Sequence, residues 1–206
     1  YGQTESAPVI SCNPPDDNRI DTVGPPLEGV ELRIHEDGEI LVRGELVMNG
    51  YWNKPDATHD AIGDGWLHTG DIGVVDGDGF VKITDRKKDI IVNSGGDNVS
   101  PQRIEGLLAL EPEIAQAMVY GDRRPHLVAL IVASDLLEGD EDIKSKIDAA
   151  LVRVNAGLAP MERVRRCILA DAPFTIENGQ MTPTLKVRRH ILKEIYETRL
   201  GALYHQ

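Results

Sequence analysis

Four stretches of the chain contain more small, polar and turn-forming residues than a hydrophobic core requires. They are YGQTE (1–5), GWLHTGD (65–71), DRKKDIIVNSGGDNVSP (85–101) and MTPTLKVRR (181–189). Around Ser94-Gly95-Gly96 a ligand could approach the backbone closely, since glycine has no Cβ. Lys186 follows Thr182-Pro183-Thr184 and precedes a helical pattern, so we expect an exposed loop on which its ammonium group can reach an anion. Taken singly, each feature is more typical of a solvated surface.

Short strands joined by tight turns are expected in the first part of the chain. Alternating apolar and polar residues predict strands at 29–34, 39–44, 72–76 and 80–85. Asp37-Gly38 and Asp78-Gly79 supply the positive φ angles that tight hairpin turns need. Between the hairpins, residues 57–62 predict one short helix, whose entry Pro55 fixes. This part is therefore predicted to be rich in β-structure.

Helices and strands mix after Arg86. Ser100 can cap a helix that has Pro101 in its first turn. Strands are predicted at 115–121 and 126–133, and two further helices at 141–155 and 187–200. The side chains expected to face the core recur at helical spacing: Ile104, Leu107 and Leu108; Ile143, Ile147, Leu151 and Val154; Val187, Ile191 and Ile195. The change of pattern predicts two domains, 1–85 and 86–206.

Composition excludes several classes of protein. The 206 residues carry a formal net charge of -12, whereas nucleic-acid-binding proteins rely on basic surfaces, so no nucleic-acid partner is expected. Cys12 and Cys167 lie far apart and the six histidines show no metal-ligand spacing, so neither a zinc site nor a disulfide scaffold is predicted. A reducing, cytoplasmic setting is expected. The chain has no apolar run that could span a bilayer, and its first residue, Tyr1, suggests a piece of a longer protein.

Taken together, the four stretches resemble in order and approximate spacing the motif series of the adenylate-forming superfamily: acyl-CoA synthetases, peptide-synthetase adenylation domains and firefly-type luciferases. GELVMNGYWNKPDAT (44–58) is similar to the family segment between the first two stretches, so the resemblance covers essentially the whole chain. The fold that it implies is α+β. A β-rich, distorted barrel-like tail of the large N-terminal domain (1–85) would precede a small, mobile α+β C-terminal domain (86–206).

The first stretch implies a nucleotide and a metal ion. Tyr1 resembles the aromatic residue that stacks on adenine, and Gly2 belongs to the same nucleotide-binding segment. Thr4 and Glu5 resemble the pair that serves the phosphates of ATP and a magnesium ion. A carboxylate suits such a hard cation. ATP, Mg²⁺ and coenzyme A are therefore the cofactor and co-substrates that the resemblance implies.

The other stretches imply the remaining roles. Asp71 resembles the aspartate that accepts hydrogen bonds from both ribose hydroxyls, and Arg86 the arginine that also contacts the ribose. Lys186 matches the lysine whose charge offsets the negative charge that gathers as a carboxylate joins the α-phosphate. A thiol then displaces AMP from the acyl-AMP. The small domain rotates between the two steps; Lys88 falls on the family's hinge position, and the loop at Gly95 resembles the segment that lines the pantetheine channel.

Some positions depart from the pattern of other family groups. Asp97 stands where many short-chain synthetases carry an arginine that can reach a phosphate. GGDNVSPQRIE (95–105) and MTPTLKVRR look more like the long-chain and very-long-chain groups than like amino-acid adenylation domains, which usually carry a GK version of the last motif. The cluster of Arg163, Arg165 and Arg166 could meet the phosphates of coenzyme A, although a solvated helix or loop face is the preferred interpretation.

The resemblance thus predicts a fragment of a long-chain fatty acid–CoA ligase. Alone it would be inactive or nearly so, because the family's phosphate-binding loop would precede Tyr1 and positioning of ATP needs both domains. Its partners would be a fatty acid, ATP, coenzyme A and the missing N-terminal domain, with peripheral membrane contact of the longer protein left open. Two alternatives remain: an adenylation domain that loads a carrier protein, and a non-catalytic binding module.

Overall fold

The computed structural model describes residues 1–205. They fold into two compact units, Tyr1–Asp89 (unit 1) and a second unit that begins at Ile90 (unit 2). Each unit has a sheet and a hydrophobic core of its own. The boundary expected from the sequence, after residue 85, falls inside a strand that runs to Arg86. Within the described residues no helix is both long and apolar enough to cross a membrane.

Unit 1 is built on a five-stranded antiparallel sheet. Its strands are β1 (Glu31–Ile34), β2 (Glu39–Arg43), β3 (Ile62–Gly63), β4 (Trp66–Val75) and β5 (Val81–Arg86). They pair in the order β1-β2-β4-β3, with β5 also on β4, so the sheet formed by the described residues is open and does not close into a barrel. The 3₁₀ helices η1 (Thr4–Ser6) and η2 (Lys87–Asp89) and the helix α1 (Pro55–Ala61) complete the unit.

The predicted hairpins of unit 1 are confirmed. Gly38 and Gly79 have φ angles of 86° and 88°, which few residues other than glycine adopt without strain. β4 is longer than predicted and includes most of the GWLHTGD stretch, because Leu67, Thr69, Asp71 and Gly73 alternate into the interior along it. The site residues of this stretch therefore stand on a strand held by neighbours on both sides.

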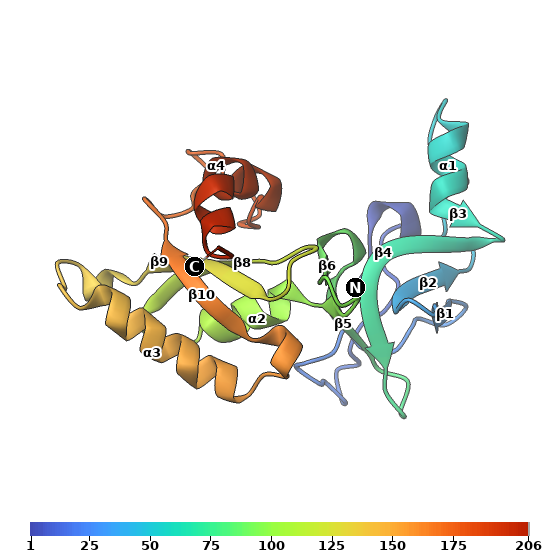
Figure 1. Cartoon of the computed structure of the whole chain (residues 1–206). Coiled ribbons are helices and arrows are strands. Elements are labelled where there is room, and N and C mark those ends of the chain that lie inside the picture. Colours follow the sequence, from blue (N-terminus) through green and yellow to red (C-terminus); the bar gives the residue numbers. More distant parts are fainter. Residues whose placement is uncertain (206) are drawn as a thin grey trace. The chain divides into compact units, whose positions relative to one another are not determined.

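Unit 2 is a three-stranded sheet covered by helices on both faces (Figure 1). Its strands are β8 (Ile114–Tyr120), β9 (Leu127–Ala133) and β10 (Val164–Leu169), and a separate small hairpin joins β6 (Ile91–Val92) to β7 (Asn98–Val99). The helices are α2 (Pro101–Leu108), α3 (Ile143–Ala156) and α4 (Arg189–Ala202), with 3₁₀ turns η3 (Asp135–Leu137) and η4 (Pro160–Glu162). α2 and α3 pack on one face of the sheet, and α4 packs on the other.

Two sequence-based expectations for unit 2 were wrong. Arg165 and Arg166 lie on β10 rather than on a helix or loop, because the buried Val164 and Cys167 hold this segment parallel to β9. In α4 the buried residues are Leu192, Tyr196 and Leu200, whereas Ile195 is 53% exposed. The predicted stripe and the observed one differ by a single position, and the observed stripe places a tyrosine and two leucines against β8 and β9.

Candidate functional site

Three residues predicted to bind one nucleotide meet in unit 1. The Tyr1 hydroxyl donates a 2.6 Å hydrogen bond to Asp71 Oδ2, and Arg86 Nε lies 2.8 Å from Asp71 Oδ1. Asp71 and Arg86 stand opposite each other on β4 and β5. The Asp71 side chain is 4% exposed, so a buried carboxylate has a neutral donor on one oxygen and a cation on the other.

The backbone around Asp71 is fixed by two buried side chains. Thr69 Oγ1 donates to the carbonyl of Ile40 at 2.7 Å and accepts from the Asp71 N–H at 3.1 Å. The Gly70 N–H donates to Glu39 Oε1 at 2.9 Å. β4 therefore presents the Asp71 carboxylate in one orientation, which suits recognition of a ligand with two adjacent hydroxyls.

The surroundings of the Tyr1 hydroxyl keep it protonated. Burial, followed by the hydrogen bond to Asp71, raises the pKa of the Tyr1 phenol well above its usual range. The phenol therefore stays protonated at neutral pH and acts as the donor. Each oxygen of an ionised carboxylate has a second lone pair, so Asp71 can accept further hydrogen bonds from a ligand without losing Tyr1 or Arg86.

Glu5 stands on η1 and is held by a second segment of unit 1. The Tyr51 hydroxyl donates to Glu5 Oε1 at 2.8 Å, and the Met48 N–H donates to the Glu5 carbonyl at 2.9 Å.

Gly2 bridges to Val9, and a Cβ built on Gly2 would lie 1.6 Å from the Pro8 carbonyl oxygen, so this turn requires glycine.

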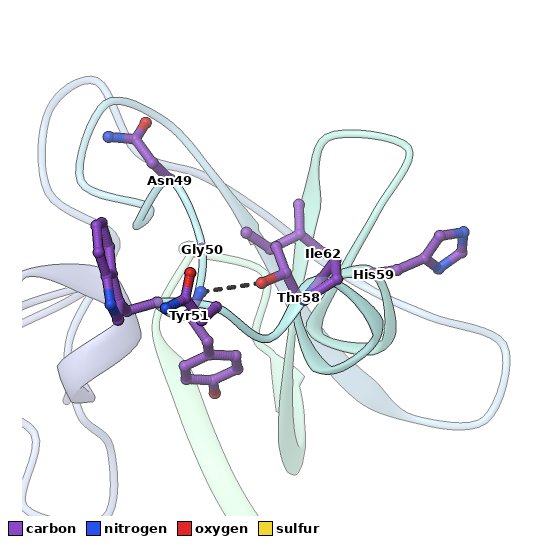
Figure 2. Close-up of a pocket in the computed structure, with 9 residues that line it drawn as sticks. Asn49, Gly50, Tyr51, Thr58, His59 and Ile62 are labelled. Carbon is purple, nitrogen blue, oxygen red and sulfur yellow. Dashed lines mark hydrogen bonds between the residues drawn. The ribbon is translucent and has the colours of Figure 1, made fainter.

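The Tyr51 segment lines an open surface pocket of about 640 Å³ (Figure 2). Within it, the Tyr51 N–H donates to Thr58 Oγ1 at 2.9 Å, and that hydroxyl donates to the Lys54 carbonyl at 2.9 Å. A Cβ on Gly50 would come within 2.6 Å of the Thr58 side chain. α1 and its approach thus hold Tyr51 at the carboxylate of Glu5.

A single metal ligand fits Glu5 better than a complete metal cage. Among residues 1–205 there is no group of three or more His, Cys, Asp and Glu side chains that could hold an ion. Glu5 would supply one hard oxygen donor, and a Mg²⁺ ion there would take its other ligands from water and from phosphate oxygens.

The loop at Gly95 in unit 2 is closed by its own side chains. Asn93 Oδ1 accepts from the N–H groups of Gly95 and Asp97 at 2.8 and 3.0 Å, and Asn93 Nδ2 donates to Asp97 Oδ2 at 2.9 Å. Gly96 has a φ of 88°. The Ser94 N–H also donates to the Arg124 carbonyl at 3.0 Å, which joins the loop to the turn between β8 and β9. Asp97 therefore shapes the loop at the position where other groups carry arginine.

Lys186 lies on an exposed turn that Thr182 closes, as the sequence predicts for its loop. The Lys186 N–H donates to Thr182 Oγ1 at 3.1 Å, and the Thr182 N–H donates to the Lys186 carbonyl at 2.8 Å. Leu185 has a left-handed backbone, with a φ of 59°. After the turn, Arg189 forms a bidentate ion pair with Glu105 of α2, which also accepts from the Val119 N–H at 2.6 Å. The start of α4, and with it the turn, is thereby tied to α2 and β8.

The structure thus brings some of the predicted residues together and leaves others on separate elements. Tyr1, Asp71 and Arg86 are in direct contact, Glu5 is held beside Tyr51, and Gly95 and Lys186 stand on separate loops of unit 2. Thr4 is exposed on η1 and Lys88 is exposed on η2. Glu39, Thr69 and Tyr51 are supporting residues that the sequence reasoning missed. Thr69 could have been found from its place in the TGD motif, two residues before Asp71, where a hydroxyl can accept from the backbone.

Comparison with known proteins identifies the family to which the chain is related. Residues 88–206 match the model described as AMP-binding enzyme C-terminal domain, and residues 1–52 match the model described as AMP-binding enzyme. The long-chain-fatty-acid–CoA ligase FadD15 of Mycobacterium bovis is 39% identical over 225 residues, which is 100% of this chain and 38% of that relative. The chain thus spans well under half of the length of this curated relative.

Two solved structures from Segniliparus rugosus share the fold. The A domain of a carboxylic acid reductase, in complex with AMP and a co-purified carboxylic acid, has a TM-score of 0.82 and 29% identity over 100% of this chain and 35% of its own. The A-PCP didomain of a carboxylic acid reductase, in complex with AMP, has a TM-score of 0.81 and 29% identity over 99% of this chain and 30% of its own. Since the C-terminal domain model matches residues 88–206, more than half of the sequence, the chain belongs to the family of AMP-binding enzymes.

Proposed function

We propose that this chain works as part of a long-chain fatty acid–CoA ligase. Such an enzyme activates a carboxylate with ATP to give acyl-AMP and pyrophosphate, and then transfers the acyl group to coenzyme A. The observation that carries the proposal is the buried Asp71 carboxylate with Tyr1 and Arg86 on its two oxygens. The name of the Mycobacterium bovis relative supports the substrate class.

In this proposal the nucleotide lies against unit 1. Asp71 accepts from the ribose hydroxyls through its remaining lone pairs, Arg86 adds a second ribose contact, and the ring of Tyr1 stacks on adenine. Gly2 belongs to the same nucleotide-binding segment and lets its turn pack against the Pro8 carbonyl, where a Cβ would clash. Thr4 faces the phosphates. Charge-assisted hydrogen bonds of this kind contribute about 1.5–3 kcal/mol each, so Asp71 should dominate recognition of the ribose.

Glu5 is the residue that we propose for Mg²⁺. Its carboxylate is presented on η1, and Tyr51 holds one of its oxygens. When bound, Mg²⁺ neutralises part of the charge on the phosphates of ATP. The role of the protein is to hold the Glu5 carboxylate still, and the hydrogen bond from Tyr51 does this.

Lys186 is the proposed catalytic residue. Negative charge concentrates where the substrate carboxylate attacks the α-phosphate, and an ammonium group at that point lowers the energy of the transition state. The hydrogen bonds between Thr182 and the Lys186 backbone hold the turn, while the side chain stays exposed for the substrate. Lys88 is the proposed hinge for the rotation between the two half-reactions, and the loop at Gly95 is the proposed lining of the pantetheine channel.

The second candidate is an adenylation domain that passes its acyl group to a carrier protein. The likeness to the A-PCP didomain of a carboxylic acid reductase favours this alternative. Adenylation would be the same in both, and only the thiol that displaces AMP would differ. The two functions are therefore separated by the acceptor alone.

The test uses the longer protein that carries this chain. AMP formation is measured with a panel of carboxylates from acetate to oleate, with and without coenzyme A. We expect long-chain acids to drive AMP formation that depends on coenzyme A, and Lys186→Ala to slow adenylation by about a hundredfold or more while supplied acyl-AMP is still transferred. AMP formation that needs a carrier protein and ignores coenzyme A would favour the second candidate. No AMP formation with any acid would refute both.

A further inference from the structure

The residue that follows Arg86 makes charge contacts that the proposed function does not use. Lys87 Nζ lies 2.7 Å from Asp37 Oδ2 and 2.8 Å from Glu39 Oε2. Asp37 belongs to the turn between β1 and β2, Glu39 begins β2, and Lys87 begins η2. We call Asp37, Glu39 and Lys87 the charge clamp. It joins the hairpin of β1 and β2 to η2, and Lys87 is 48 positions beyond Glu39 in the sequence.

Glu39 is the buried centre of the charge clamp. Its side chain is 3% exposed, and it also accepts hydrogen bonds from His68 Nδ1 at 3.0 Å and from the Gly70 N–H at 2.9 Å. A carboxylate buried to this degree needs partners for its charge, and loss of one of them is unfavourable. Lys87 supplies a positive charge at neutral pH, and Asp37 forms an ion pair with the same ammonium group.

Lys87 lies between the last residue of the sheet and the proposed hinge. The ladder between β4 and β5 ends at the pair Asp71–Arg86, so Lys87 is the first residue beyond the sheet. Lys88, the proposed hinge, comes next. The same Glu39 carboxylate holds the Gly70 N–H, immediately before Asp71, and the Lys87 ammonium, immediately after Arg86. One buried group therefore supports the nucleotide-binding strands and the start of η2.

We propose that the charge clamp fixes Lys87 to unit 1 and so sets the point at which the hinge rotation begins, at Lys88. Lys87 and Glu39 act as positioning residues and touch no substrate. The inference rests on the proposed function, which gives Lys88 its hinge role. Hinges absorb large changes of backbone angle at a few residues, and a firm attachment on one side confines the rotation to the residues beyond it.

The test compares three variants of the longer protein. Lys87→Met removes the charge and keeps the length of the side chain, and Lys87→Arg restores the charge. Lys82→Met is the matched control. Lys82 also belongs to unit 1, and its side chain is 47% exposed, against 46% for Lys87. Its ion pair is with Asp21, at 2.9 Å, and does not involve the charge clamp. Amide hydrogen exchange at 87–89 reports the attachment, and kcat and KM are measured for adenylation and for thioester formation from supplied acyl-AMP.

We expect Lys87→Met to speed amide exchange at 87–89 about tenfold and to lower kcat of both half-reactions about fivefold or more, with KM for ATP within twofold. Lys87→Arg should recover most of both effects, and Lys82→Met should show neither. Unchanged exchange, or a raised KM for ATP with an unchanged kcat, overturns the inference. If the wild type adenylates no acid, the proposed function fails, and the exchange measurement still decides whether the charge clamp holds Lys87.

Discussion

The hydroxyl of Tyr1 donates a 2.6 Å hydrogen bond to Asp71 Oδ2, although the two residues are 70 positions apart in sequence. With Arg86 on Oδ1, the Asp71 carboxylate already has a donor on each oxygen before any ligand arrives. The ribose hydroxyls must therefore use the remaining lone pairs of the same two oxygens. This relationship separates two possible roles of Tyr1, the stacking of its ring and the hydrogen bond of its hydroxyl.

Tyr1→Phe keeps the ring and removes the hydroxyl. We expect the free energy of unfolding to fall by about 1 kcal/mol, because a buried carboxylate loses one donor. KM for ATP should stay within about twofold, since the vacated lone pair becomes available to the ribose. Tyr1→Ala should raise KM for ATP about tenfold, because the stacking surface is lost as well. Urea denaturation and steady-state kinetics of the longer protein measure the two effects, and equal KM values for both variants would contradict a stacking role.

Asp71→Asn tests the carboxylate itself. The substitution keeps the shape of the side chain and removes the charge that faces Arg86. We expect the free energy of unfolding to fall by about 1–2 kcal/mol. This loss is smaller than for a fully buried ion pair, because solvent screens the Arg86 side chain, which is 42% exposed. AMP should bind about tenfold more weakly or worse, because charge-assisted hydrogen bonds to the ribose are lost.

The matched control for this charge is Asp21→Asn. Asp21 also forms an ion pair within unit 1, with Lys82, but its side chain is 71% exposed. Its substitution should change stability by less than about 0.5 kcal/mol. AMP binding, measured by calorimetry on the longer protein, should stay as in the wild type. Equal effects of the two substitutions on AMP binding would remove Asp71 from the ribose site.

The parts of the fold that depend on neighbours in sequence could be predicted. The Asp37-Gly38 turn, and Ser100 before Pro101, act within a few residues, and the structure has the hairpin and the helix start that they predict. β10 could not be predicted, because its residues become a strand only by pairing in parallel with β9. The stripe of α4 was also missed, since two apolar stripes fit the helical period and only packing on the sheet selects Leu192, Tyr196 and Leu200.

Glu39, which supports the candidate site, could not be predicted from the sequence because its role also depends on long-range contacts. Glu39 stands in a predicted strand, where a glutamate is expected to face solvent, yet β2 buries Glu39 together with the three apolar residues that follow it. Its ion-pair partner Lys87 is 48 positions away. A motif resemblance finds residues that touch a ligand, whereas residues that hold them in place are defined by long-range contacts.

The charge clamp should also shape the dependence of stability on pH. Lys87 holds the pKa of Asp37 below its usual range, and although burial opposes ionisation of Glu39, hydrogen bonds from Lys87, His68 and the Gly70 N–H hold its pKa below the usual range too. Carboxylates with depressed pKa values stabilise the folded state above their unfolded pKa of about 4 and lose this contribution as the pH falls through the folded value. The wild type should therefore lose stability steadily in acid.

Lys87→Met should make this acid loss smaller. At pH 7 the variant should be less stable than the wild type by about 1 kcal/mol, a modest value because the Lys87 side chain is 46% exposed. The gap should begin to close below about pH 4 and narrow further as the pH falls through the depressed pKa values of Asp37 and Glu39, because protonation removes the charges that Lys87 pairs with. Urea denaturation at a series of pH values measures the difference. A gap that stays constant from pH 7 to pH 3 would show that the stabilisation does not come from these carboxylates.

Leu185 offers a test of the turn that carries Lys186. Its φ of 59° costs an L-residue about 1 kcal/mol, and its side chain is 67% exposed, so little packing is lost on substitution. Leu185→Gly should raise the free energy of unfolding by up to about 0.5 kcal/mol, because the entropy that glycine adds to the unfolded chain offsets most of the relieved strain. Leu185→Ala, which keeps the strain, should change stability by less than about 0.5 kcal/mol. Thermal unfolding of the chain measures both. If Leu185→Gly destabilises the protein more than Leu185→Ala does, the left-handed conformation at Leu185 carries no strain. The hydrogen bonds to Thr182 would then be what holds the turn.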